Sequence, residues 1–420
     1  MEHLPRYLSN TLEALPEKFQ PEDFLEDVQR RKRHFTPRSM LLTLIQLVSS
    51  TNKEGYDHAL TKVFGVLNAP RKGALSWFRK QITYKFFERI FTQTITNFDR
   101  HRPTFNGLIL YAVDGWQLTL PREKDIVDAG YTGRALGKYR ESYMPKGFMT
   151  HCYEVLSETT KTFSMNHSQT ELADALTFID KFEANSLTLY DRAYFSRSLC
   201  VAHFNAGNYF IARCRSNANK QVSEFFSETN EDVTSMYYQT DKGKKKVWFL
   251  KLINPKTGEF VIFATNLPRS WRNKKTLDQL YQLRWGAETS FYELSETVKI
   301  QQWHSKSYNG ILQELYTTLL VINLVKILSF FARGQKHIDP KISTYRKANF
   351  KLLLNHFVDF VTTSQPKLVN LIYEFQLLIK RSTEKRKRRS RGHPREIRSP
   401  ASPYPHNNTE WVWDKDYSLN

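Results

Sequence analysis

The chain has 420 residues, of which 40% are hydrophobic and 14% aromatic, so it can bury several cores and is not a disordered basic protein. Its formal net charge of +20 makes a polyanion the expected partner, with nucleic acid as the first candidate. The cysteines, Cys152, Cys200 and Cys214, are few and far apart, which argues against a disulfide framework or a cysteine-type zinc site and favours a reducing compartment.

Residues 1–100 are predicted to form a helical DNA-binding domain. Apolar residues recur at helical spacing after Pro37, and again between residues 77 and 91. Basic clusters lie at residues 30–33 and 71–80. Such clusters are ordinarily solvated helix faces, but the net charge makes contact with DNA an equal alternative.

The pattern changes to short apolar runs from about residue 106. The run at 108–113 predicts a buried strand, and Asp114-Gly115 predicts a turn into a second strand at 116–120. The segments that follow predict the first part of a catalytic core over residues 101–206, with strands at 148–157, 162–165 and 186–190 and helices at 171–182 and 196–206.

Residues 207–268 alternate strand-like runs with turn-forming residues. We expect them to form a β-strand insertion that lies outside the main sheet. The second part of the core is predicted over residues 269–345. It contains a helix from Leu280 to Lys299 and an apolar helix at 310–332.

The chain is expected to be soluble and cytoplasmic, with no membrane partner. The apolar helix at 310–332 is interrupted by Asn323 and Lys326, which favours a buried helix over a membrane span. The N-terminus alternates charged and apolar residues and does not resemble a signal sequence.

Residues 346–420 are predicted to form C-terminal helices followed by a basic tail. The helices at 346–380 have an apolar side and are the candidate for a dimer interface. Lys380–Arg398 contains ten Lys or Arg residues and two Glu. This tail is either a flexible basic segment or a sequence-independent contact to phosphates, and the two descriptions are compatible.

Three carboxylates stand where they could form a catalytic site. Asp114 and Asp191 each end an apolar strand-like run, and Glu288 shares a predicted helix face with Tyr281 and Arg284. A carboxylate beside a buried strand costs several kcal/mol unless it is paired or bound to a cation, so converging acids suit Mg²⁺ or Mn²⁺. For this helix taken alone, a surface Arg/Glu pair is the simpler explanation.

The sequence motifs around these acids identify a function more specifically than the spacing of the acids does. Asp114 stands in DGWQLTLP, Asp191 in YDRAYFS, and Glu288 in YQLRWGAE, which follows ATNLP. In order and context these motifs resemble the DDE transposases of bacterial insertion sequences, in the group with a Tyr-Arg-Glu-Lys signature (insertion-sequence family four). The resemblance covers residues 100–335 and, loosely, the N-terminal helices.

This resemblance implies a fold and an activity. The fold would be α/β, with an RNase H-like mixed-sheet core interrupted by a β-strand insertion. Asp114, Asp191 and Glu288 would be the catalytic residues and would bind two Mg²⁺ (or Mn²⁺) ions, which activate the attacking oxygen and stabilise the leaving one. The protein would cut double-stranded DNA at transposon ends and join the 3′ ends to target DNA.

The resemblance also implies partners and contacts to DNA. Tyr281 and Arg284 match the signature residues that grip phosphate, for which a phenol and a guanidinium are suited. Synapsis of two ends requires at least a homodimer, because one active site must process each end. The site of action would be the bacterial nucleoid.

The fourth position of the signature differs, because Ser295 stands where the family has Lys. Lys299 is the candidate replacement if the helix extends that far. Arg213 matches a strand arginine common in the family, and Arg215 would face the same way. Both would lie along DNA; the alternative is that they protect an exposed strand edge.

Two questions remain open at this level. Trp248 and Trp271 are both candidates to stack on a flipped base, a task for which any indole is suited. Two alternatives to a transposase also stand: an RNase H-like nuclease without strand transfer, and a catalytically decayed DNA-binding relic.

Overall fold

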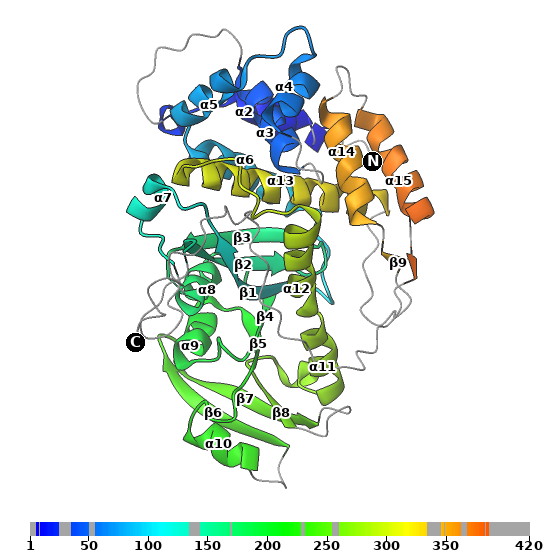
Figure 1. Cartoon of the computed structure of the whole chain (residues 1–420). Helices are drawn as coiled ribbons and strands as arrows, with labels where there is room; N and C mark the ends of the chain where they lie inside the picture. Colours follow the sequence, from blue (N-terminus) through cyan, green and yellow to red (C-terminus); the bar gives the residue numbers. More distant parts are fainter. Residues whose placement is uncertain are drawn as a thin grey trace, which may run out of the picture.

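The structure is a computed structural model in which a mixed β-sheet carries helices on both faces and a helical layer covers one end (Figure 1). It describes residues 6–7, 9–24, 35–49, 55–133, 143–168, 170–227, 232–253, 260–333, 346–347, 349–362, 368–382 and 384–385. The basic cluster predicted at residues 30–33 and most of the predicted basic tail lie outside these residues.

The main sheet has eight strands in the order β3-β2-β1-β4-β5-β8-β7-β6. Strand β2 pairs antiparallel with both β1 and β3, whereas β4 and β5 run parallel to β1. The predicted α/β class with an RNase H-like mixed sheet is therefore confirmed. The strands are β1 Ile109–Thr119, β2 Lys146–Glu154, β3 Thr159–Asn166, β4 Ser186–Tyr190, β5 Tyr209–Arg213, β6 Val233–Thr240, β7 Gly243–Ile253 and β8 Phe260–Thr265.

Strand β1 continues straight through Asp114-Gly115, and the turn predicted there is wrong. Asp114 pairs with His151 of β2, and Gly115 pairs with Thr150. Asp-Gly favours a turn locally, but here the ladder with β2 supplies the backbone hydrogen bonds and keeps the chain extended. Asp114 therefore lies within a strand instead of at its end.

The strands of residues 207–268 belong to the main sheet, which corrects the prediction of an insertion outside it. Strand β5 pairs parallel with β4, and β8, β7 and β6 continue the same sheet beyond it. Helix α10 (Lys220–Ser227) is the helix within this segment. In Figure 1 these strands extend the sheet away from the helical layer.

Both faces of the central strands are buried, which is why their sequences are continuous apolar runs. Along β1, Tyr111 and Val113 enter the core on one face, while Leu110 and Ala112 enter the core on the other. The first face is covered by α8 (Glu171–Ile179) and α9 (Arg197–Ala206), and the second by α11 (Lys274–Gln282) and α12 (Trp285–Tyr292) (Figure 1).

The helical layer surrounds the long helix α13 (Tyr308–Ala332), which is the buried helix that the sequence predicts. By length and composition α13 could cross a membrane, but 89% of its most apolar window is buried inside the molecule. The other helices of this layer are α3 Pro37–Ser49, α4 Tyr56–Phe64, α5 Lys72–Gln81, α6 Tyr84–Phe98, α14 Phe350–Thr362 and α15 Leu368–Ser382.

One core joins this helical layer to the sheet. It contains Leu41 and Phe87 from the N-terminal helices together with Leu118 and Met149 from β1 and β2. Within the described residues, the N-terminal helices therefore share their core with the sheet. The remaining short elements are η1 Asn10–Ala14, α2 Leu15–Glu17, η2 Pro21–Asp23, α7 Lys124–Asp128, η3 Arg269–Trp271, η4 Glu293–Thr297, β9 Arg346–Lys347 and β10 Glu384–Lys385.

The apolar side of the C-terminal helices is occupied within the chain. Leu353, Leu354 and Phe357 of α14 and Phe375 of α15 are buried in the core shared with α3 and α13. These four side chains are therefore not available to a second copy, whereas Leu352 of α14 and Tyr373 of α15 are exposed. The dimer interface stays a prediction.

Candidate active site

Two acids stand at the same level, where the pairing of two parallel strands ends. The pairing of β1 with β4 ends at Val113 and Tyr190, and Asp114 and Asp191 are the next residues of the two segments. The Asp114 side chain is 22% exposed, so it borders the buried part of the sheet and is open to solvent on one side. The sheet thus brings together two carboxylates that are 77 positions apart in the sequence.

The third acid comes from a segment that is less regular than predicted. The expected single helix from 280 to 299 is divided into α11, α12 and the π-helical turn η4. A tight turn separates α11 from α12, in which the Arg284 N–H donates to the carbonyl of Tyr281 at 3.0 Å. Gly286 lets α12 approach the sheet, because a Cβ there would stand 3.1 Å from the Tyr153 ring.

The five central residues of the sequence prediction form one cluster. Arg284 donates from Nη1 to Asp114 Oδ2 at 3.1 Å and from Nη2 to Glu288 Oε1 at 3.0 Å. The Tyr281 hydroxyl donates to Asp191 Oδ1 at 3.4 Å. Three carboxylates, a guanidinium and a phenol from distant parts of the chain therefore meet at the edge of the sheet.

The protonation of Asp114 is perturbed by this environment. Burial raises the pKa of Asp114 to about 6, and the negative charges of Asp191 and Glu288 act in the same direction. The Arg284 guanidinium and a hydrogen bond from the Gly115 N–H oppose that rise. Burial likewise raises the pKa of the Tyr281 phenol, which therefore stays protonated at neutral pH.

The donor set fits a divalent metal ion in chemistry, although Arg284 lies among the carboxylates. Carboxylate oxygens are the ligands that Mg²⁺ and Mn²⁺ prefer, and a cation would relieve the repulsion that contributes to the raised pKa of Asp114. As the described side chains stand, no group of three or more His, Cys, Asp and Glu residues is close enough to hold a metal ion. Metal binding at Asp114, Asp191 and Glu288 would thus require Arg284 to move.

Glu171 is a neighbour of this cluster that the sequence analysis did not single out. It lies in the first turn of α8, and its carboxyl group covers the backbone of Gly115 so closely that a Cβ there would stand 2.2 Å from it. The signal in the sequence was Gly115 itself, since a glycine inside a strand often marks a close approach. Trp116, the next residue, packs on Phe291 of α12 with ring centroids 5.5 Å apart and ties β1 to that helix.

Lys299 lies beyond the helix that was expected to carry it. The π-helical turn ends at Thr297, and Lys299 lies beyond it with a φ of +54°. The condition for the replacement, a helix that extends to residue 299, is therefore not met. Ser295 lies within the π-helical turn, where its hydroxyl donates to the carbonyl of Tyr292 at 3.4 Å.

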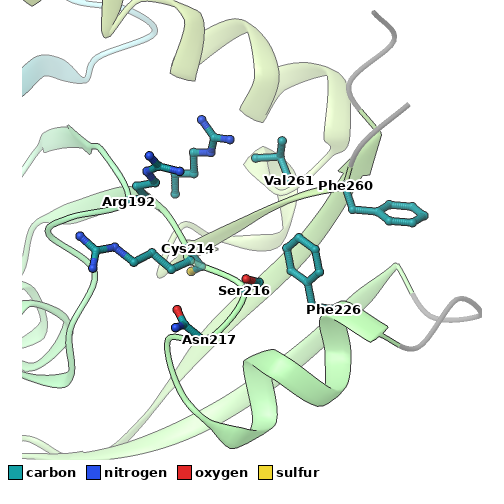
Figure 2. A pocket seen from close by; sticks show the side chains of 9 residues that line it. Arg192, Cys214, Ser216, Asn217, Phe226, Phe260 and Val261 are labelled. Atoms are coloured by element: carbon teal, nitrogen blue, oxygen red, sulfur yellow. The ribbon is translucent and has the colours of Figure 1, made fainter. Parts of the chain in front are cut away.

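Arg213 and Arg215 line a basic pocket next to the acids. Arg213 is the last residue of β5, Arg215 lies exposed just beyond it, and Arg192 follows Asp191 directly. The pocket has a volume of about 480 Å³. Figure 2 shows Arg192 on one side of it and the rings of Phe226 and Phe260 on the other.

The two candidate tryptophans contact residues outside the acid cluster. The Trp248 ring is covered by the guanidinium of Arg272, 3.9 Å from its centroid, and by the ammonium of Lys246 at 4.3 Å. Trp271 packs on Phe105, which precedes the start of β1. These contacts give no preference for either indole as the base-stacking residue.

Comparisons with known proteins identify the family of the chain. The model of the transposase DDE domain family matches residues 112–324, just over half of the chain. A search of curated proteins found no match. Among solved structures, a cryo-EM structure of the piggyBac transposase synaptic complex with hairpin DNA is similar, with a TM-score of 0.46 and 12% identity over 90% of this chain and 83% of that chain.

Proposed function

Because the chain belongs to the transposase DDE domain family, we propose that it binds the inverted-repeat ends of a mobile element, cuts the DNA there and joins the 3′ ends to target DNA. The observation that carries this proposal is the convergence of Asp114, Asp191 and Glu288, with Tyr281 and Arg284 between them. The net charge of +20 fits a DNA substrate of any sequence.

DDE domains use divalent metal ions, and we assign two Mg²⁺ or Mn²⁺ ions to Asp114, Asp191 and Glu288. Such ions activate the attacking oxygen and stabilise the leaving oxygen of a phosphodiester. The chain itself supplies a rigid frame for the reaction: β1 and β4 hold the two aspartates at one level, and α12 holds the glutamate. Arg284 and Tyr281 offer donors to the phosphate of the bound strand.

We also propose that the protein belongs to the bacterial insertion-sequence group with the Tyr-Arg-Glu-Lys signature and acts on DNA in the nucleoid. The support is that Tyr281, Arg284 and Glu288, which match the first three signature residues, contact the two aspartates or one another. The basic pocket with Arg213 and Arg215 would lie along the DNA next to the cut. Two DNA ends call for two copies of the chain, hence a homodimer in the synaptic complex.

The test uses the full chain and labelled DNA that carries the inverted repeats flanking the gene. With Mg²⁺ present, we expect cleavage at the repeat ends and joined products. Cleavage without joining would instead indicate a nuclease, and binding without either product would indicate a decayed relic. Glu288→Gln should abolish cleavage, whereas the matched control Glu296→Gln, at an exposed acid of η4, should not.

A further inference from the structure

The residues suited to gripping DNA phosphate contact the carboxylates instead. Arg284 donates to Asp114 at 3.1 Å and to Glu288 at 3.0 Å, and Tyr281 donates to Asp191 at 3.4 Å. Each of the three acids therefore has a hydrogen bond from one of these two side chains. A guanidinium that bridges two carboxylates places a positive charge where a metal ion would bind. The guanidinium and the metal ion therefore compete for the same carboxylates.

Arg284 is not fully satisfied in this position. Its side chain is only 8% exposed, and its Nε is buried without a hydrogen-bond partner among the residues that the structure describes. A buried unpaired donor costs free energy, more so when the group is charged. An additional acceptor near Arg284 would remove that cost, and a phosphate oxygen is the acceptor to which a guanidinium is best matched.

We propose that Arg284 and Tyr281 form an autoinhibitory contact that keeps divalent cations out of the acid site until DNA is bound, an inference that rests on the proposed function. When a DNA phosphate arrives, Arg284 exchanges the carboxylates for phosphate oxygens. Asp114 and Glu288 then lose their contacts with Arg284, and the negative charge of the acid site attracts the metal ion. Because coupling between two ligands is reciprocal, metal binding also tightens DNA binding by the same factor.

Arg284 can exchange its partners while helix α12 keeps its position on the sheet. Arg284 lies in the tightened turn between α11 and α12, where the backbone keeps right-handed helical angles and the Arg284 N–H donates to the carbonyl three residues back. The far end of α12 is fixed, because Glu293 of η4 forms an ion pair at 2.8 Å with Lys326 of the buried helix α13. We therefore expect the movement to be confined to the side chains and to the turn at Arg284.

The test is a titration of the full chain with Mn²⁺, in which free Mn²⁺ is measured by electron paramagnetic resonance. Without DNA, Arg284→Gln should bind Mn²⁺ at least about tenfold more tightly than the wild type, within the usual range of coupling between sites. Added inverted-repeat duplex should tighten Mn²⁺ binding to the wild type and have little effect on Arg284→Gln. The matched control Arg269→Gln removes an equal charge at an exposed site and should leave the affinity unchanged.

A second, milder variant tests the same contact in case Arg284→Gln does not fold. Tyr281→Phe keeps the ring that packs on Phe263 at 4.5 Å and removes only the hydroxyl that contacts Asp191. It should tighten Mn²⁺ binding by about threefold without DNA, as expected for the loss of one competing hydrogen bond. Thermal unfolding establishes that both variants are folded.

The outcomes separate this inference from the function on which it rests. If Asp114→Asn loses Mn²⁺ binding while folded Arg284→Gln and Tyr281→Phe bind Mn²⁺ no more tightly than the wild type, the autoinhibitory contact is refuted and the metal site stands. If Asp114→Asn binds Mn²⁺ like the wild type, the proposed metal site itself is wrong.

Discussion

Two buried arginines of this protein each bind a glutamate at nearly the same distance, yet their surroundings differ. Arg79 donates to Glu314 at 2.9 Å, and Arg284 donates to Glu288 at 3.0 Å. The Nε of Arg79 also donates to Gln313, whereas that of Arg284 is buried without a partner in the described part of the chain. We call the first cluster complete because the Nε of its arginine is paired, and the second incomplete because the Nε of its arginine is not. An unpaired buried donor is expected of a site that awaits a ligand.

The acids of the two clusters show the same difference. Burial alone would raise the pKa of Glu314, but Arg79 and His304, whose backbone N–H donates to Glu314 Oε2 at 2.9 Å, hold this pKa at about 2. At Asp114 the effect of burial wins over Arg284, and the pKa rises to about 6. A carboxylate that the fold leaves poorly compensated is a candidate for function, because its charge is available to a substrate or a metal ion.

The largest expected effect is on catalysis at the incomplete cluster. Asp114→Asn should lower the rate of DNA end cleavage by at least about a thousandfold, because it removes one metal-binding carboxylate. The free energy of unfolding should not fall, since the variant also removes an unfavourable buried charge. Cleavage assays and urea unfolding of the same preparation measure both quantities. A variant that cleaves normally would show that Asp114 is not catalytic.

The next effect is on stability at the complete cluster. Glu314→Gln should lower the free energy of unfolding by about 3–5 kcal/mol, because it leaves the charge of Arg79 buried without its counter-ion. Glu288→Gln, the same substitution in the other cluster, should cost less than about 1 kcal/mol, since Glu288 is 33% exposed. Urea unfolding of the two variants compares them directly. Equal losses would mean that the clusters do not differ in the way described.

The pH dependence of stability should have opposite signs at the two acids. The pKa of Glu314 is lowered to about 2, so its contribution, about 3 kcal/mol, is complete above pH 4.5 and is lost as the pH falls toward 2. The pKa of Asp114 is raised to about 6, so it destabilises the protein by up to about 3 kcal/mol above pH 6, and this penalty disappears as the pH falls toward 3.8.

Unfolding measured from pH 3 to pH 8 tests both signs. The stability difference between the wild type and Asp114→Asn should change between pH 4 and pH 6, and that between the wild type and Glu314→Gln should change only below about pH 4.5. A flat difference for Asp114→Asn would contradict the raised pKa.

The smallest effect concerns the departure from the family signature. Ser295→Lys places a positive charge in η4, the segment that follows the helix of Glu288. It should tighten binding of end DNA a few-fold and steepen the dependence of log K on log salt by about one. Binding curves at several salt concentrations measure this slope. An unchanged slope would mean that position 295 does not face a phosphate.

The residues of the site could be predicted from local patterns together with a family resemblance. Asp114 and Asp191 follow apolar runs of two parallel strands, and Tyr281, Arg284 and Glu288 share a helical spacing; each pattern is visible within a short stretch. These patterns alone left a surface Arg/Glu pair as the simpler explanation of the helix. The resemblance of the surrounding motifs, in their order, to the DDE transposases is what predicted one cluster.

The errors arose where distant partners decide the local structure. Asp114-Gly115 has turn chemistry, but its pairing with β2 keeps it extended. The turn at Leu283-Arg284 contains no Pro or Gly and coincides with the contacts of Arg284 to the acids. The strands after Arg213 join the main sheet through β8, which lies some 50 residues further along the chain and gives no local signal.

The most direct test of the central claim is to map the metal site on the protein itself. Fe²⁺ replaces Mg²⁺ in the complex of the full chain with end DNA, and peroxide and ascorbate then cut the backbone beside the bound ion. We predict cuts close to Asp114, Asp191 and Glu288, and their loss in Asp114→Asn. Cuts elsewhere in the chain, or cuts that persist in that variant, would contradict a metal site built from these three acids.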